Sequence, residues 1–299
     1  MFQASTKKID PLIFSTALFQ LMKPRVMSLV IFTCVVGLII APNQINLLNS
    51  VVSLIAVAVG AGAAGTLNMW YESDLDALMK RTCLRPIPSG KISKNQALIF
   101  GVLTAFLSVI VLYISSNLLA ASMLAVTILF YVLIYTIWLK RKTPQNIVIG
   151  GAAGAFPPII GWTISTGTLA MEPIILFLII FFWTPSHFWA LSLYKAEDYA
   201  KAKIPMLPVI SGIRTTKINI FVYSIILFLS ALSPYFLGFA GLSYFIISGT
   251  LSTYYVYLCY KLLKTNDKVS EDGLAKRIFG YSIIYLFAIF TLILFDNIV

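Results

Sequence analysis

Residues 49–85 read NSVVSLIAVAVGAGAAGTLNMWYESDLDALMKRTCLR, in which a long apolar run ends abruptly in a segment crowded with charge. The apolar part, 49–70, is long enough to cross a bilayer as a helix. The segment after it carries three carboxylates and three cationic side chains within fifteen residues. Charge beside a membrane helix costs free energy, so this segment is a candidate functional site.

The whole chain has the composition of an integral membrane protein. It is 299 residues long, 59% hydrophobic and only 11% charged, which leaves too little polar surface for an ordinary water-soluble domain. We therefore expect an all-α, polytopic membrane protein forming a single membrane-embedded domain over 1–299. Nine apolar stretches are long enough to span a bilayer, namely 26–42, 49–70, 94–115, 118–139, 145–165, 173–194, 216–240, 242–263 and 275–296.

The lysines and arginines give the orientation. All 22 of them fall in the N-terminal arm or in alternate loops, and the intervening loops contain none. Because cytoplasmic loops are enriched in Lys and Arg, we predict a cytoplasmic arm over 1–22, a cytoplasmic N-terminus and an external C-terminus. The three cysteines, Cys34, Cys83 and Cys259, share no metal-binding spacing, and we predict no disulfide.

Two of the cytoplasmic loops, 71–93 and 195–215, are long and carry acids among the bases. Asn68, Glu72 and Asp76 recur every four residues, so on a helix they lie about 40° apart per step on one side. Oxygen ligands gathered in this way suit a hard divalent cation. Acids and bases together suit a diphosphate bound through Mg²⁺.

The alternative is that each loop is a solvated connector with positive-inside charge. That bias explains the bases of loop 71–93 but not three acids within five residues, whereas for loop 195–215 the two interpretations are evenly balanced. Asp74 complicates the metal hypothesis, because on an ideal helix it points about 160° away from Asp76.

Two further features lie within or beside the spans. Lys140, Arg141 and Lys142 precede a Gly- and Ala-rich span that Pro157-Pro158 should break or kink. The only histidine, His187, lies inside the aromatic span FFWTPSHFWALSLY, and an ionisable group in a span is a functional hypothesis by default. The alternative is a structural histidine that hydrogen-bonds a neighbouring helix.

Four ordered blocks carry a family resemblance: LMKPRVMSLV at 21–30, NMWYESDLDALMKRTCLRPIPSG at 68–90, LKRKTPQNIVIGGAAGAFPPIIGW at 139–162 and WTPSHFWALSLYKAEDYAKAKIPMLPV at 183–209. Together they resemble the intramembrane aromatic prenyltransferases of the UbiA superfamily. Within that superfamily they are most similar to the branch of protohaem IX farnesyltransferases, or haem O synthases.

The resemblance implies a nine-helix bundle with a central cavity that opens to the cytoplasmic side, in a bacterial inner membrane. It implies transfer of a farnesyl group from farnesyl diphosphate to the 2-vinyl group of haem B, with addition of water, as a step toward haem A. It also implies Mg²⁺ as cofactor, and it suggests a haem A synthase as a partner. Nucleic acid is not expected to bind.

The same resemblance assigns roles to residues. The metal ligands would be Asn68, Glu72, Asp74, Asp76 and Asp198, with Asp74 the least certain, and the catalytic set would be Asn68, Glu72, Asp76, Asp198 and Arg81. The diphosphate would contact Lys23, Arg81, Lys140, Arg141, Lys195 and Lys203, and haem would contact His187.

This chain departs from the family's pattern at three positions. The second acidic motif keeps one certain carboxylate, Asp198, because Ala202 follows it four residues later. Lys203 stands where a glycine is usual, and Ser186 stands where a second proline is common.

Two other functions compete with this one. A related enzyme could prenylate a quinone precursor such as a hydroxybenzoate. From a different class, a protein with nine spans and charges could be a transporter. The transporter is disfavoured because the sequence has no internal repeat and its charges lie at helix ends, not at mid-membrane.

Overall fold

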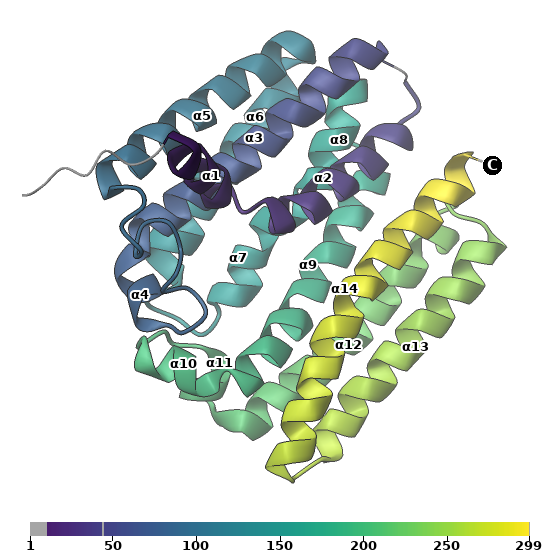
Figure 1. The fold of residues 1–299 in the computed structure, drawn as a ribbon. Helices are drawn as coiled ribbons and strands as arrows, with labels where there is room; N and C mark the ends of the chain where they lie inside the picture. The colour runs from purple at the N-terminus through teal and green to yellow at the C-terminus, as the bar shows by residue number, and fades with distance from the viewer. Residues whose placement is uncertain (1–10, 44, 299) are drawn as a thin grey trace, which may run out of the picture.

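The computed structural model describes residues 11–43 and 45–298, and every regular element in that part of the chain is a helix (Figure 1). The helices are α1 (Pro11–Leu21), α2 (Pro24–Ile39), α3 (Leu47–Tyr71), α4 (Ser73–Leu78), α5 (Lys94–Ser115), α6 (Leu118–Leu129), η1 (Phe130–Leu139), α7 (Asn146–Ala155), α8 (Pro157–Thr166), α9 (Met171–Tyr194), α10 (Ala196–Lys201), α11 (Leu207–Ile210), α12 (Gly212–Phe236), α13 (Leu242–Lys264) and α14 (Lys268–Ile298). The expected all-α membrane class is confirmed. The N-terminal arm is described only from Pro11 onward, where it forms α1.

Within the described residues, seven helices are long and apolar enough to cross a membrane, or up to eight if the bent pair formed by α1 and α2 is one span. Two of the seven spans each consist of two successive helices, α6 with η1 and α7 with α8. The expected stretch 242–263 corresponds to α13, which has sufficient length but is rich in Ser, Thr and Tyr and is not among the seven. The expected count of nine therefore stays a prediction.

The helices form two groups that pack against each other. In the first group α3 packs along α5 and α2 along α8, around a core that includes Val57 and Leu124. In the second group α9, α12, α13 and α14 pack together around a core that includes Leu227 and Tyr285. α7 and α2 join the groups, because α7 packs on α9 and α2 contacts α14 (Figure 1).

The predicted break at Pro157-Pro158 is confirmed, since α7 ends at Ala155 and α8 begins at Pro157. α8 lies so close to α2 that a Cβ on Gly161 would collide with the backbone of Cys34, and a Cβ on Gly37 would collide with that of Pro158. Only glycine allows such an approach, so these two residues let the broken span press against α2.

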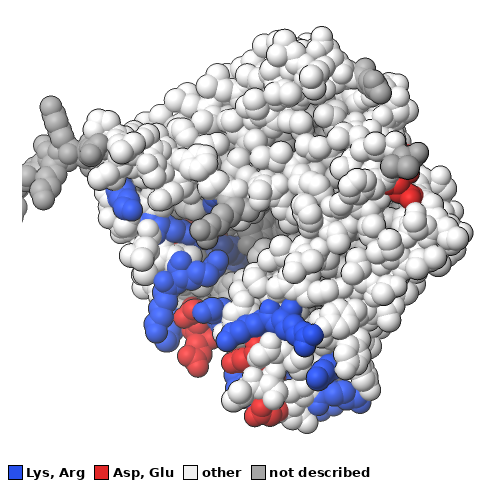
Figure 2. Space-filling view, turned by 45° about the vertical axis from the view of Figure 1, so that its right-hand side comes forward, with Lys and Arg blue, Asp and Glu red and all other residues white. Residues whose placement is uncertain are grey.

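The charged side chains collect at one end of the bundle. Figure 2 shows Lys and Arg gathered around a recess at that end, with Asp and Glu among them, whereas the rest of the face is almost free of charge. The short helices α4, α10 and α11 lie at this end in Figure 1, and the C-terminus lies at the opposite end. This arrangement brings the two acidic loops to the same end of the molecule.

Candidate active site

The end of α3 and the short helix α4 carry the first acidic motif. Glu72 is both the last cap of α3 and the first cap of α4, and its amide still donates to the carbonyl of Asn68, while the amide of Asp76 donates to that of Glu72. The four-residue spacing therefore continues across the break. Asn68, Glu72 and Asp76 are only 2%, 3% and 4% exposed, in agreement with their expected position on one buried side.

A separate cation meets each of these three side chains. Lys23 Nζ donates to Asn68 Oδ1 over 2.7 Å, and Lys140 Nζ donates to Glu72 Oε2 over 2.5 Å. Arg85 Nη1 lies 2.8 Å from each carboxylate oxygen of Asp76. The two carboxylates are almost fully shielded from water, so removal of either cation would leave a buried carboxylate charge without its partner.

The π-helix η1 supplies both a polar contact and the position of Lys140. The amide of Asn68 donates from Nδ2 to Thr136 Oγ1 over 3.0 Å, and the Thr136 hydroxyl in turn donates to the carbonyl of Tyr131, five residues back. The Lys140 amide closes the same wide turn on the carbonyl of Tyr135 over 2.9 Å. π-Helices are rare and frequently occur at functional sites.

Asp74 points away from this group, as expected. Its side chain is 53% exposed and pairs with both terminal nitrogens of Arg141, at 2.9 and 3.1 Å. Partial burial by itself raises the pKa of Asp74, but hydrogen bonds from Arg141 and from the Leu75 backbone hold that pKa below its ordinary value. Asp74 therefore fixes Arg141 at the rim and does not join the buried carboxylates.

The sequence analysis did not assign roles to Arg85, Thr82 or Thr136. Arg85 lies nine residues after Asp76 in an irregular loop, and Thr82 Oγ1 donates to the Asp76 carbonyl over 2.9 Å and so anchors that loop. No helical periodicity applies across such a loop, and the only signal for Arg85 was a second arginine just before Pro86. The predicted Arg81 is exposed.

The second acidic loop begins where α9 ends. Lys195 links α9 to α10, and Asp198 lies half-buried in the first turn of α10. Lys203 adopts a left-handed backbone with φ 53°, a conformation that glycine takes without strain. A pocket of about 380 Å³ separates α4 from this loop, and its lining is Leu75, Leu78, Arg141, Lys201, Ala202 and Lys203.

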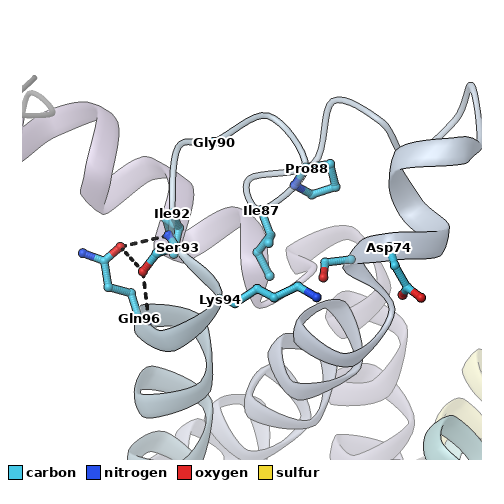
Figure 3. A pocket seen from close by; sticks show the side chains of 9 residues that line it. Asp74, Ile87, Pro88, Gly90, Ile92, Ser93, Lys94 and Gln96 are labelled. Atoms are coloured by element: carbon cyan, nitrogen blue, oxygen red, sulfur yellow. Dashed lines mark hydrogen bonds between the residues drawn. The ribbon is translucent and has the colours of Figure 1, made fainter. Parts of the chain in front are cut away.

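A larger pocket of about 510 Å³ lies on the other side of α4, between that helix, the loop 87–92 and the start of α5 (Figure 3). Lys94 extends across it toward α4, while Ser93 and Gln96 form a hydrogen-bonded capping box at its edge. Asn68, Glu72 and Asp76 do not line either pocket. We therefore define the candidate site by the buried contacts of these three side chains and not by a pocket.

Known proteins similar to this chain identify its family. The profile of the UbiA prenyltransferase family matches residues 30–291. The chain belongs to the UbiA prenyltransferase family. It is therefore a transferase of the membrane, which excludes the transporter alternative.

Among the family's members, the protoheme IX farnesyltransferase of Pelagibacter ubique is 62% identical over 281 residues, which cover 94% of this chain and 93% of the relative. The enzyme of the same name from Parvibaculum lavamentivorans is 51% identical over 93% of this chain and 88% of its own length.

Solved UbiA structures share the fold. A structure described as digeranylgeranylglyceryl phosphate synthase superposes with a TM-score of 0.79 at 19% identity, covering 95% of this chain and 99% of its own. A UbiA homologue from Archaeoglobus fulgidus bound to GPP and Mg²⁺ superposes with a TM-score of 0.65 at 16% identity, covering 93% of this chain and 99% of its own.

The donor chemistry of this UbiA site fits a divalent cation. Glu72 Oε1 is buried and has no hydrogen-bond partner among the described residues, which is costly for a carboxylate oxygen. Asn68 and Asp76 place further oxygens on the same side, and oxygen is the ligand that Mg²⁺ prefers. Within the described part of the chain, however, no three His, Cys, Asp or Glu side chains are already gathered as a metal cage.

His187 lies in a packed aromatic stack between α9 and α14. Its ring is 4.2 Å from that of Trp183 and 4.5 Å from that of Phe279, and Nδ1 lies 2.6 Å from Ser282 Oγ. The side chain is 6% exposed. This arrangement favours the structural alternative for His187, and haem contact stays a prediction.

Proposed function

We propose that this chain transfers the farnesyl group of farnesyl diphosphate to the 2-vinyl group of haem B, and releases diphosphate and haem O. The observation that carries this proposal is the 62% identity, over 94% of the chain, to the Pelagibacter protoheme IX farnesyltransferase. Solved neighbours of the same fold have other acceptors or none in their descriptions, so the fold alone does not select haem.

We assign the diphosphate to the group around Glu72 and Asp76. Asn68, Glu72 and Asp76 would hold Mg²⁺ from the first motif, with Asp198 from the second. When bound, Mg²⁺ would neutralise charge on the diphosphate. The carboxylates of this motif already accept hydrogen bonds from Arg85, Lys140 and Arg141. An arriving diphosphate would replace these carboxylate oxygens as the partner of the three cations.

The chain's cations would favour departure of the leaving group. As the bond between farnesyl C1 and oxygen breaks, its electron pair passes to the diphosphate, and Lys140, Arg85 and Lys23 would stabilise the growing negative charge. The haem vinyl group then supplies the electrons of the new carbon–carbon bond. Water adds to the resulting macrocycle-stabilised cation and loses a proton, which leaves a hydroxyethylfarnesyl chain. Apolar walls would keep water from the farnesyl cation before that bond forms.

The remaining topological assignments belong to this proposal. They are nine spans, a cavity open to the cytoplasm, a cytoplasmic N-terminus and an external C-terminus in a bacterial inner membrane. The one-sided distribution of Lys and Arg supports the orientation. A haem A synthase would be the natural recipient of the product.

The test is a two-acceptor assay. Purified protein in lipid vesicles receives farnesyl diphosphate, Mg²⁺ and either haem B or 4-hydroxybenzoate, and the products are identified by mass spectrometry. We expect haem O from the first acceptor and no product from the second, with activity lost in EDTA and restored by Mg²⁺. Prenylation of the phenolic acid alone would replace haem with a quinone precursor as acceptor.

A further inference from the structure

Two lysines converge on one tyrosine at the charged end of the bundle. Lys195 Nζ lies 6.0 Å from the ring centroid of Tyr194, and Lys276 Nζ lies 5.8 Å from the same centroid. The first lysine follows α9 and the second lies on α14, so the fold brings them together from positions far apart in the sequence. Tyr194 is half-buried.

These cations differ from those of the first acidic motif. A salt bridge to a carboxylate holds each of the earlier cations, Lys140, Arg85 and Arg141. Neither Lys195 nor Lys276 has a salt-bridge partner among the described residues. Positive-inside bias accounts for lysines at this end of the bundle, but not for two of them on one ring. Two lysines held at one ring, neither of them in a salt bridge among the described residues, leave a site that favours an anion.

Tyr194 also joins this cation pair to the aromatic interior. Its ring meets Phe279 edge-on at 6.3 Å, and Phe279 stacks on His187, which stacks on Trp183. A row of packed aromatic rings therefore leads from the bundle interior to the two lysines. A ligand that fits has a flat apolar body and carboxylates at one edge.

We propose that Lys195 and Lys276, positioned around Tyr194, bind the propionate carboxylates of the haem acceptor. The propionates occupy one edge of haem and the vinyl groups the opposite edge, so this anchor turns the vinyl edge away from Tyr194 and into the membrane site. The inference rests on the proposed function, and it moves Lys195 from the diphosphate to the acceptor.

The test compares haem B with its dimethyl ester, which keeps the macrocycle and vinyl groups but has no carboxylate charge. Both are titrated into purified wild-type protein, Lys276→Gln and Lys264→Gln, and binding is followed by the Soret band. Lys264 is the matched control, because its Nζ lies 5.6 Å from the Tyr260 ring in the same kind of contact and is likewise exposed. Thermal unfolding verifies that each variant is folded.

We expect wild type and Lys264→Gln to bind haem B about tenfold more tightly than the ester. Lys276→Gln should lose most of that preference by weakening haem B alone, with the KM for farnesyl diphosphate unchanged. A wild type that binds both forms equally, or a Lys276→Gln that keeps the preference, would overturn the propionate site. Haem O formation by the wild type, measured separately, reports on the proposed function whichever way the titration turns out.

Discussion

Two buried glutamates, one at each charged corner of the bundle, have similar surroundings. Glu72 and Glu271 are 3% and 4% exposed, each accepts a hydrogen bond from a lysine through Oε2, and each leaves Oε1 buried without a hydrogen-bond partner among the described residues. Glu271 has a second lysine, Lys268, with Nζ 3.6 Å from Oε1, whereas Glu72 has Lys140 as its one salt-bridge partner among the described residues.

The difference lies in how the cations are used. Lys217, the partner of Glu271, also donates to the carbonyl of Thr265 over 2.7 Å, so one ammonium ties α12 to the end of α13 and to α14. Because Lys217 already donates to two protein groups, it has little hydrogen-bonding capacity left for a ligand. Around Glu72 the cations come from the residue before α2, the residue after η1 and the 82–85 loop. In the proposed function, Lys140 and Arg85 would exchange their carboxylate partners for phosphate oxygens. A buried ion pair by itself therefore does not identify an active site.

The largest expected effect is on turnover at the first corner. Asp76→Asn removes the charge that faces Arg85 and the proposed Mg²⁺ while keeping the side-chain volume, so we expect kcat to fall by at least about 100-fold with little change in thermal stability. Haem O formation in saturating Mg²⁺ measures it. Asp74→Asn is the control and should retain most activity, because its exposed pair lies outside the buried group. Full activity of Asp76→Asn would remove Asp76 from the metal shell.

At the second corner we expect the reverse pattern. Lys217→Met leaves the Glu271 charge buried without its partner, which should lower the free energy of unfolding by about 3 kcal/mol or more. Activity per folded molecule should stay near that of the wild type. The double variant Lys217→Met/Glu271→Leu should recover much of the lost stability, measured by denaturation in detergent. If Lys217→Met lowered activity without lowering stability, the Glu271 corner would be catalytic and not structural.

A smaller loss of stability is expected from substitution of His187. His187→Ala opens a gap between Trp183 and Phe279 and removes the partner of Ser282, so we expect a loss of about 2 kcal/mol in stability. A structural role predicts equal losses in the use of haem and of farnesyl diphosphate among the molecules that remain folded. A selective rise in the KM for haem would restore His187 as a haem contact.

The smallest effect is at Lys203, and it has the opposite sign. Its left-handed backbone costs a residue with a Cβ about 1 kcal/mol relative to glycine, so Lys203→Gly should raise thermal stability slightly. Lys203→Ala is the matched control, because it removes the ammonium but keeps the backbone strain. If both variants changed stability equally, the side chain and not the backbone would be responsible.

Local regularity determines how much of this could be predicted from sequence. The apolar runs located the long helices, and the four-residue spacing predicted one shared side for Asn68, Glu72 and Asp76. The structure buries all three, because helical hydrogen bonds continue across the break between α3 and α4. The partners Lys23 and Arg85 could not be predicted in this way, since each depends on an irregular backbone, left-handed at Lys23 and looped before Arg85.

His187 illustrates the second limit. A lone histidine in an apolar span has the same sequence signature whether it meets a ligand or a neighbouring serine, and only the position of Ser282 on α14 distinguishes the two. Pairing between distant helices is decided by packing across the bundle. At Lys203 the sequence showed a lysine in the place of a usual glycine, and the structure adds that the backbone there is left-handed.

The wide turns of η1 determine which side chains of this segment face the site. With hydrogen bonds five residues apart, Tyr131, Thr136 and Lys140 come round to one side, where Thr136 meets Asn68 and Lys140 meets Glu72. On an α-helix of the same sequence, Lys140 would lie on roughly the opposite side from Tyr131. Deletion of a single residue from this turn would therefore rotate Lys140 away from Glu72. The site would lose that positive charge although every functional side chain would still be present in the sequence.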